Sequence, residues 1–301
     1  MCRFLTILIV AFIAAFSPAY AQESLNVVAT FSILGDFAKN VGGDRVSVTA
    51  LVGPDSDTHV YTPTPADAKK ITDAKLVIVN GFGLEGWLPR LVKSSGGKAV
   101  TVVATRGIAP RKIEVGEALS QDHDVGSADP HAWQSVVNAK TYIANIRDAL
   151  VAADPAGAEA YRANAAAYLA KLDALDAEVR AAVAKIPPER RSVISTHDAF
   201  GYFADAYGVK FIAPQGVSTE SEPSARDIAA IITQIRKQKI PAVFLENVSD
   251  PRLMRRMAAE TGANIGGTLY SDSLTGEKGS APTYIDMVRH NIKALTSALS
   301  N

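Results

Sequence analysis

Short apolar runs rich in β-branched residues alternate along the chain with longer amphipathic segments. Eight runs have the pattern of buried strands: 25–33, 46–52, 75–81, 99–105, 192–196, 209–214, 242–247 and 264–271. Helical periodicity marks segments between them, such as 224–239 and 250–262. Continuous apolar strands separated by helices are typical of parallel sheets with helices on both faces. The pattern therefore predicts an α/β fold.

The two halves of the chain also resemble each other. FSILGDFAKNVGGD, from residue 31, is similar to HDAFGYFADAYGVK, from residue 197. We therefore expect two related lobes with mainly parallel sheets flanked by helices. We call residues 22–153 the first lobe and residues 189–301 the second lobe. Chance similarity between βα units is the alternative explanation.

A long helix is expected between the lobes, over residues 154–188. Asp154–Pro155 favours its start and Pro187–Pro188 its end. A stripe of apolar residues recurs at three- and four-residue spacing: Tyr161, Tyr168, Leu172, Leu175, Val179 and Val183. Roughly 32 residues at about 1.5 Å each give a rod of about 48 Å. Such a rod is long enough to run along both lobes as one rigid linker helix.

Residues 1–21 have the pattern of a secretory signal. Arg3 precedes an apolar core, and the small residues AYA at 19–21 favour cleavage after Ala21. A membrane anchor is the alternative, but the apolar run is short for a span and polar residues follow it at once. Cys2 lies too near the start to carry a lipid at the cleavage site. We therefore expect a periplasmic protein without a lipid anchor.

Charge and cysteine content narrow the functional classes. Removal of residues 1–21 removes one positive charge from a chain with 31 basic and 31 acidic residues, so the mature net charge is near −1. This balance does not favour a nucleic-acid or anionic-membrane partner. The single cysteine leaves with the signal. A metal would therefore be bound by His, Asp or Glu.

Two candidate metal ligands lie in the first lobe. His59 lies in a polar loop that two nearby prolines stiffen, and a solvated loop histidine is the alternative. His131 lies in the sequence DPHAW, where Asp129 and Pro130 favour a helix start and Trp133 can anchor the turn. A neutral imidazole at this position is the form that binds metal. An exposed histidine at the helix start is the alternative.

Two further candidates follow predicted strands of the second lobe. His197 comes directly after 192–196 and Asp272 directly after 264–271. In open α/β sheets, ligands bind beyond the carboxyl ends of the strands. A local hydrogen bond with Asp198 and a helix cap are the respective alternatives. With the first-lobe candidates, these residues supply three nitrogens and one oxygen, enough to close a tetrahedral shell.

The remaining motifs are weaker candidates for a functional site. We expect His123, in an acidic loop, to be solvated or to capture metal transiently, and His290 to be a surface residue on the last helix. GFGLEG at 81–86 formally matches a dinucleotide-binding pattern, but its bulky residues favour a packed turn. The sequence contains no HExxH pair, phosphate-binding loop or nucleophile elbow.

Four segments together resemble the TroA-like zinc and manganese solute-binding proteins of ABC transporters. They are HVYTPTPAD from 59, DPHAW from 129, STHDAFGYFADAYG from 195 and LYSDSL from 269, and the resemblance covers essentially the whole mature chain. It implies a receptor rather than an enzyme, with metal ligands at His59, His131, His197 and Asp272. It further implies a metal between the lobes, a modest closure limited by the long helix, and docking on a membrane permease.

The third ligand position separates subgroups of this family, since many of its manganese receptors have glutamate there. His197 gives three imidazoles and one carboxylate, a donor set that favours zinc over manganese. The loop before the second ligand is short and contains His123 alone, whereas many zinc receptors have a histidine-rich loop there. We expect a high-affinity zinc receptor that delivers Zn²⁺ to an ABC importer, with Mn²⁺ as the alternative cargo.

Competing functions and partners follow from the same residues. A secreted zinc hydrolase with three histidine ligands would need a general base, for which Glu220 or Glu222 is available. A surface adhesin of the same fold is less favoured, because no lipid anchor is expected. We expect a monomer, and a periplasmic metal chaperone is a further candidate partner.

Overall fold

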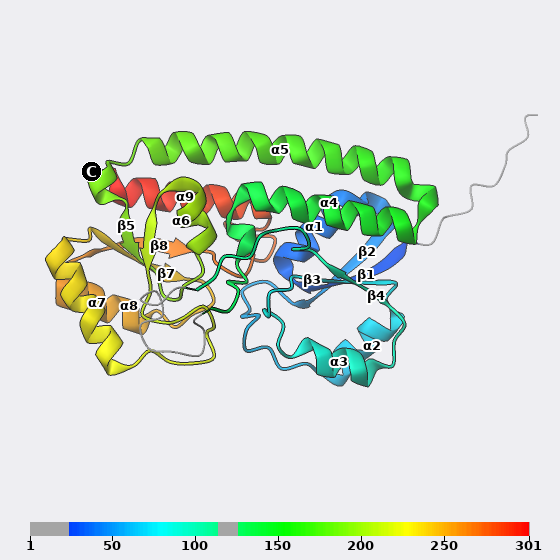
Figure 1. Cartoon of the computed structure of the whole chain (residues 1–301), viewed down its shortest axis with the longest axis horizontal. Helices are drawn as coiled ribbons and strands as arrows, with labels where there is room; N and C mark the ends of the chain where they lie inside the picture. Colours follow the sequence, from blue (N-terminus) through cyan, green and yellow to red (C-terminus); the bar gives the residue numbers. More distant parts are fainter. Residues whose placement is uncertain (1–23, 114–125, 301) are drawn as a thin grey trace, which may run out of the picture.

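Two four-stranded parallel sheets form the centres of the two lobes (Figure 1). The computed structural model describes residues 24–113 and 126–300. Strand order is β2-β1-β3-β4 in the first sheet and β6-β5-β7-β8 in the second, and all the paired strands run parallel. The two orders are equivalent, so the prediction of two related α/β lobes is confirmed.

The eight strands found among the described residues all lie within the apolar runs that predicted them. Their bounds are β1 Leu25–Phe31, β2 Val46–Val52, β3 Leu76–Val79, β4 Val100–Val103, β5 Ser192–Ile194, β6 Lys210–Ile212, β7 Ala242–Glu246 and β8 Asn264–Leu269. The central strands β3 and β7 are almost entirely buried. This burial on both faces explains why their sequences are continuously apolar rather than alternating.

Helices cover both faces of each sheet. Their bounds are α1 Ser32–Gly42, α2 Pro65–Asp73, α3 Leu88–Ser95, α4 Val136–Ala153, α5 Ala158–Ala184, α6 Gly201–Tyr207, α7 Ala225–Gln238, α8 Arg252–Thr261 and α9 Tyr284–Leu299. In Figure 1, α1, α4, α5 and α9 form a layer above the sheets, and α2, α3, α7 and α8 lie below. None of the helices within 24–113 and 126–300 combines the length and apolarity needed to cross a bilayer.

The linker helix α5 extends along both lobes, as predicted (Figure 1). It has 27 residues, or about 40 Å at 1.5 Å per residue. The helix is shorter than the predicted 154–188. A 3-10 turn at Pro155–Gly157 precedes it, and it ends at Ala184, before Pro187 and the 3-10 turn Pro188–Arg190. The predicted apolar stripe is completely buried. The structure does not test the lobe boundaries themselves, which stay a prediction.

One hydrophobic core passes through both lobes. It combines the α5 stripe with first-lobe residues such as Phe37 and Tyr142 and with second-lobe residues such as Phe244 and Leu269. Two smaller clusters fill the space beneath the sheets, one in each lobe. The helix layer above the sheets is therefore a shared core that joins the lobes.

The helix start predicted at Asp129 and Pro130 is wrong. Helix α4 begins at Val136, and the side chain of Ser135 accepts a hydrogen bond from a backbone amide of its first turn. A 3-10 turn, Ala132–Gln134, precedes it. Asp129 does not cap the helix, because its carboxylate binds the backbone and ring nitrogens of His131.

Candidate metal centre

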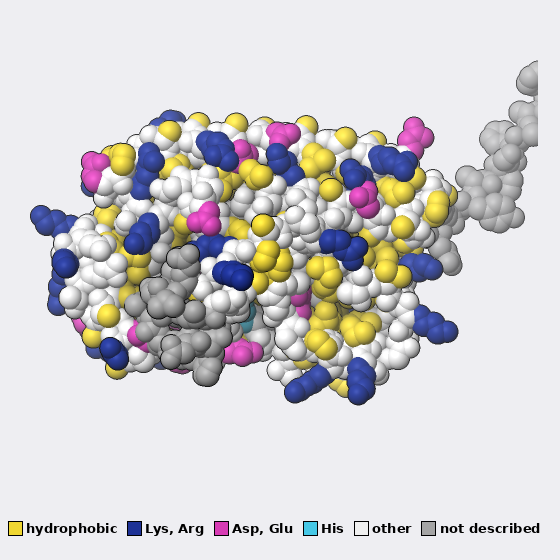
Figure 2. Space-filling view, viewed as in Figure 1, with side chains coloured by type: hydrophobic (Ala, Val, Ile, Leu, Met, Phe, Trp, Pro, Cys, Tyr) yellow, Lys and Arg dark blue, Asp and Glu magenta, His cyan; other side chains and the backbone are white. Residues whose placement is uncertain are grey.

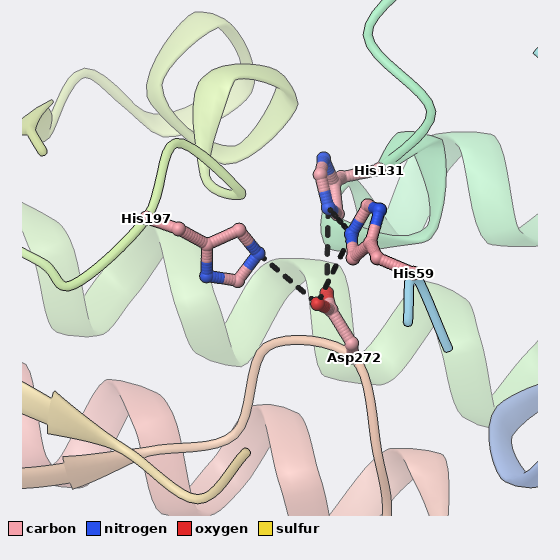
Figure 3. Close-up of side chains that lie close together, drawn as sticks. All are labelled: His59, His131, His197 and Asp272. Atoms are coloured by element: carbon pink, nitrogen blue, oxygen red, sulfur yellow. Dashed lines mark hydrogen bonds and ion pairs between the residues drawn. The ribbon is translucent and has the colours of Figure 1, made fainter. Parts of the chain in front are cut away.

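The structure brings all four predicted ligands together between the lobes (Figure 3). His59 lies in the loop between β2 and α2, His131 before α4, His197 after β5 and Asp272 after β8. All four side chains are buried. In the space-filling view of Figure 2, a histidine is visible in the hollow between the lobes, with acidic side chains around it.

The separations between the donor atoms fit one tetrahedral ion. His59 Nε2 lies 3.2 Å from His131 Nε2, and Asp272 Oδ2 lies 3.4 Å from His59 Nε2 and 3.0 Å from His197 Nε2. The other oxygen of Asp272, Oδ1, lies 3.4 Å from His131 Nε2. A tetrahedral zinc with bonds of about 2.0 Å separates its ligand atoms by about 3.3 Å. With Asp272 Oδ2 as the carboxylate donor, three of the separations match the edges of such a shell. One donor atom from each of the four residues lies within 4.8 Å of the others.

The polar atoms at the centre lack ordinary partners. Among the described residues, His197 Nε2 and both carboxylate oxygens of Asp272 are buried without a well-aligned hydrogen bond. Such atoms are costly to bury unless a ligand satisfies them. The orphaned atoms and the donor set both fit a divalent cation.

Charge at the centre changes the pKa of two of these groups. Burial alone would lower the pKa of His197, but the carboxylates of Glu246 and Asp272 raise it well above its usual value. Burial alone would raise the pKa of Asp272, but His197 and His131 lower it well below its usual range. Both shifts have the same cause, because the buried carboxylates favour positive charge at the centre. A bound cation would supply such a charge.

Two further carboxylates orient the imidazoles from outside. Asp129 Oδ1 accepts hydrogen bonds from the backbone N and Nδ1 of His131, both at 2.9 Å. Glu246 accepts from the backbone N of His197 at 3.1 Å and pairs with its Nδ1 at 2.5 Å. A carboxylate on Nδ1 fixes the tautomer whose Nε2 lone pair faces the centre.

Sequence reasoning missed Glu246, which carries a detectable signal. It is the last residue of β7, which pairs with β5, and His197 follows β5. The carboxyl ends of parallel strands meet at one edge of a sheet. The argument that selected His197 therefore applies equally to Glu246.

The His59 loop is braced from two sides. Asp57 Oδ1 accepts from the backbone N of His59 at 2.9 Å, and the indole of Trp87 donates to the carbonyl of Thr58 at 2.9 Å. After the loop, Tyr61 donates to Asp67 in the first turn of α2. The stiff loop expected from the sequence is thus held by side chains as well as by prolines.

The other candidates lie away from the cluster. His123 falls outside the described residues. His290 is half-buried rather than a surface residue, because its ring packs against Tyr270 and Nε2 lies 3.0 Å from the Thr268 carbonyl. Glu220 and Glu222 are exposed and do not belong to the cluster.

The GFGLEG segment is a turn, as expected from its bulky residues. Gly81, Phe82 and Gly83 have φ values of 94°, 54° and 85°. Glu85 is buried and accepts hydrogen bonds from Thr30 and from the backbone of the turn. The glutamate therefore stabilises the turn internally.

Comparison with known proteins decides the family. A family model described as "ZnuA: Zinc-uptake complex component A periplasmic" matches residues 27–298. The chain belongs to this family. Members are periplasmic metal-binding, substrate-binding proteins of ABC transporters, which work with membrane permease and ATPase components.

Relatives in the family bind different metals, according to their names. The chain is 38% identical over 292 residues to "Iron-binding protein YfeA" of Yersinia pestis, covering 97% of this chain and 92% of that protein. It is 36% identical over 306 residues to "Manganese-binding lipoprotein MntA" of Halalkalibacterium halodurans, covering 100% and 99%. The family is therefore shown, and the metal is not decided by these names.

Solved structures confirm the fold. The "periplasmic zinc binding protein TroA" of Treponema pallidum has a TM-score of 0.84 at 32% identity, covering 93% of this chain and all of that chain. A Mn-bound "periplasmic metal binding protein" from Candidatus Liberibacter asiaticus has a TM-score of 0.81 at 33% identity, covering 92% and all of that chain.

These findings establish a metal receptor of an ABC transporter. The predicted signal and Cys2 lie outside the described residues. The MntA relative is called a lipoprotein. The expected absence of a lipid anchor therefore gains no support from this relative and stays a prediction.

Proposed function

We propose that this protein is a high-affinity periplasmic zinc receptor that captures Zn²⁺ between its lobes and delivers it to an ABC importer. His59, His131, His197 and Asp272 are the proposed ligands. The observation that carries the proposal is their convergence, with three donor separations of 3.0–3.4 Å that match the edges of a zinc tetrahedron.

The donor set supports zinc over manganese. Three imidazoles and one carboxylate suit zinc, whereas manganese is better served by oxygen donors. Glu246 adds to this argument because it is buried against His197 Nδ1. A glutamate at position 197 would bring a second buried carboxylate against Glu246. The surroundings of this position therefore match an imidazole.

Manganese is the second candidate cargo, and the name of the MntA relative favours it. Zinc also binds more tightly than manganese to most nitrogen-containing sites, whatever the biological cargo. A direct comparison of both metals on designed variants is therefore needed.

A hydrolytic function is less favoured. Catalytic zinc sites keep one coordination position for water. Here Asp272 supplies a fourth protein ligand within 3.4 Å of the imidazole nitrogens. A shell filled by the protein suits capture and release of the ion.

The test is a competition titration of the metal-stripped protein with zinc and manganese. We expect zinc to bind far more tightly than manganese, and His197→Ala to weaken zinc binding at least tenfold. His290→Ala removes a histidine outside the cluster and should leave both affinities unchanged. Manganese binding as tight as zinc binding, or no effect of His197→Ala, would contradict the proposal.

A double variant tests the role of the third ligand. His197→Glu with Glu246→Gln supplies an oxygen donor while avoiding two adjacent buried carboxylates. We expect this variant to lose more zinc affinity than manganese affinity, because it exchanges nitrogen for oxygen.

Delivery requires export and an accessible cleft. We propose that the signal is cleaved after Ala21 and that the mature protein acts as a monomer on its permease. A metal chaperone as donor stays a hypothesis without support from a described surface.

A further inference from the structure

Ser271, the residue before Asp272, is hydrogen-bonded by residues of the first lobe, although it lies in the second lobe by sequence. The carbonyl of Ser271 accepts a hydrogen bond from the indole of Trp133 at 2.9 Å and from the side-chain amide of Gln134 at 2.7 Å. Both donors are buried. Two buried donors on one carbonyl fix the backbone that carries the Asp272 side chain.

The residues after the ligand are bound by the first lobe as well. The backbone N of Leu274 donates to Ser32 Oγ at 3.0 Å, and its carbonyl accepts from the backbone N of Asp55 at 2.9 Å. The hydroxyl of Ser273 lies 3.3 Å from the carbonyl of Gly53. First-lobe contacts therefore bracket the ligand on both sides.

The following helix begins on the first lobe too. Tyr284, the first residue of α9, donates from its backbone N to Asp36 at 3.1 Å and from its hydroxyl to the carbonyl of Trp133 at 2.6 Å. From the second lobe, Asn247 reaches this segment with a longer bond of 3.3 Å to the carbonyl of Ser273. The backbone of Tyr270, two residues before the ligand, is still bound by Asn291 of α9. From Ser271 to Tyr284, most of the described hydrogen bonds to other parts of the chain attach the segment to the first lobe.

His197, in contrast, is held by residues of the second lobe. Its backbone N and Nδ1 are bound by Glu246 at the end of β7, and its carbonyl accepts from Ser195 at 3.1 Å. An isolated bridge pairs it with Gln215. Its position therefore follows the second sheet.

We propose that Asp272 is mechanically a ligand of the first lobe, so that metal release separates His197 from one rigid unit of His59, His131 and Asp272. Ser32 and Gln134 are then the positioning residues that keep Asp272 in this unit. The inference rests on the proposed metal-receptor function and adds which of its ligands moves. With His197 withdrawn, two imidazoles and one carboxylate retain the ion, and a coordination position opens for exchange.

Helix α6 supplies the pivot for this motion. The hydroxyl of Tyr202 donates to the carbonyl of Asp129 at 3.0 Å and accepts from the backbone N of Arg111 at 2.8 Å. Gly201 permits this approach, since a β-carbon there would lie 2.7 Å from Asp129 Oδ2. The second sheet turns about this contact while the shared helix layer stays in place.

Distance measurements between spin labels test the division into bodies. In the mature protein without residues 1–21, and hence without Cys2, pairs of cysteines replace the exposed residues Lys93 on α3, Glu277 between Asp272 and α9, and Lys237 on α7. Electron–electron double resonance is recorded with zinc bound and after removal by a chelator. We expect the Lys93–Glu277 distance to stay constant, and the Glu277–Lys237 distance to change by more than about 2 Å, the scale of a genuine rearrangement.

Substitution of the positioning residues provides a second measurement. Ser32→Ala removes the acceptor of the Leu274 amide, so we expect a broader Lys93–Glu277 distance distribution and about tenfold faster zinc dissociation, with association unchanged. Ser32→Thr keeps the hydroxyl and should restore both. Asn247→Ala, which removes the second-lobe contact, should leave the Lys93–Glu277 distribution narrow.

The outcomes separate this inference from the proposed function. A Lys93–Glu277 distance that changes with zinc, or a Glu277–Lys237 distance that does not, would overturn the inference while zinc still binds in the same samples. Failure of the labelled parent protein to bind zinc would instead overturn the proposed function, and with it the inference.

Discussion

At the scale of single residues, two buried carboxylates hold two of the imidazoles of the metal centre in place. Asp129 and Glu246 each bind one backbone N and the Nδ1 of a histidine. Each carboxylate therefore fixes both the ring orientation and the tautomer. Glu246 also accepts the backbone N of Thr196 at 2.7 Å, which ties the ligand to the end of β5.

Replacing Glu246 tests this role. Glu246→Gln preserves the shape but removes the negative charge that makes the His197 ring more basic. We expect zinc affinity in a competition titration to fall about tenfold or more. Glu260→Gln, on an exposed ion pair with Arg256, is the matched control and should not change affinity. Equal affinities for the parent and Glu246→Gln would show that the carboxylate does not tune the ligand.

The sequence predicts ligands better than it predicts their supports. His197 and Asp272 were identifiable because they follow apolar strands, whose ends are easy to locate. The same strand-end argument applies to Glu246, but it does not say which side chain Glu246 contacts, because its partner is 49 residues away in the chain. Asp129 was misassigned as a helix cap, because Asp before Pro is equally typical of a cap. The choice between the two roles depends on tertiary contacts that local sequence does not contain.

At the scale of elements, the start of α2 anchors the loop that carries His59. Thr64 and Asp67 form a reciprocal capping box, and Asp67 also accepts from Tyr61 and pairs with Lys70. Burial alone would raise the pKa of Asp67, but the bonds from Lys70 and Thr64 dominate and hold it well below its usual value. Ionised Asp67 therefore stabilises the folded state.

This shift predicts how stability depends on pH. Because the folded-state pKa is lowered, the contribution of Asp67 is complete above the unfolded pKa of about 3.9 and is lost as pH falls below it. Asp67→Asn should reduce the free energy of unfolding by about 1–2 kcal/mol at pH 7. In urea titrations, the difference from the parent should hold to about pH 4 and shrink below it.

A control on the same helix completes this test. Asp73→Asn changes an exposed carboxylate paired with Lys69 and should alter stability little at any pH. If the deficit of Asp67→Asn were as large at pH 3 as at pH 7, the ionised capping box would not be its source.

Elements with strong periodicity were predictable, and those set by tertiary contact were not. The strands and the buried stripe of α5 follow directly from the apolar pattern. The start of α4 does not, because the chain first makes a 3-10 turn at Ala132–Gln134. That turn places Trp133 and Gln134 against the carbonyl of Ser271. The partner lies in the other half of the sequence, so no local pattern predicts it.

At the scale of the whole molecule, the shared core couples the two lobes. The buried face of α5 packs on α1 and α4 of the first lobe and on α9 of the second. Loss of packing contacts anywhere along this face should therefore destabilise both lobes. Such coupling agrees with a receptor whose closure is limited, because separation of the lobes as independent bodies would expose this core.

Unfolding of the metal-free protein tests the coupling. Both tryptophans, Trp87 and Trp133, lie in the first lobe, so their fluorescence reports that lobe, whereas far-UV circular dichroism reports the whole chain. Leu172 is fully buried in α5, and Leu172→Ala should cost about 2–5 kcal/mol. We expect both signals to shift together in urea. Lys171→Ala, at the exposed neighbouring position, should shift neither. A fluorescence transition that stays in place while the dichroism changes would show that the lobes unfold independently.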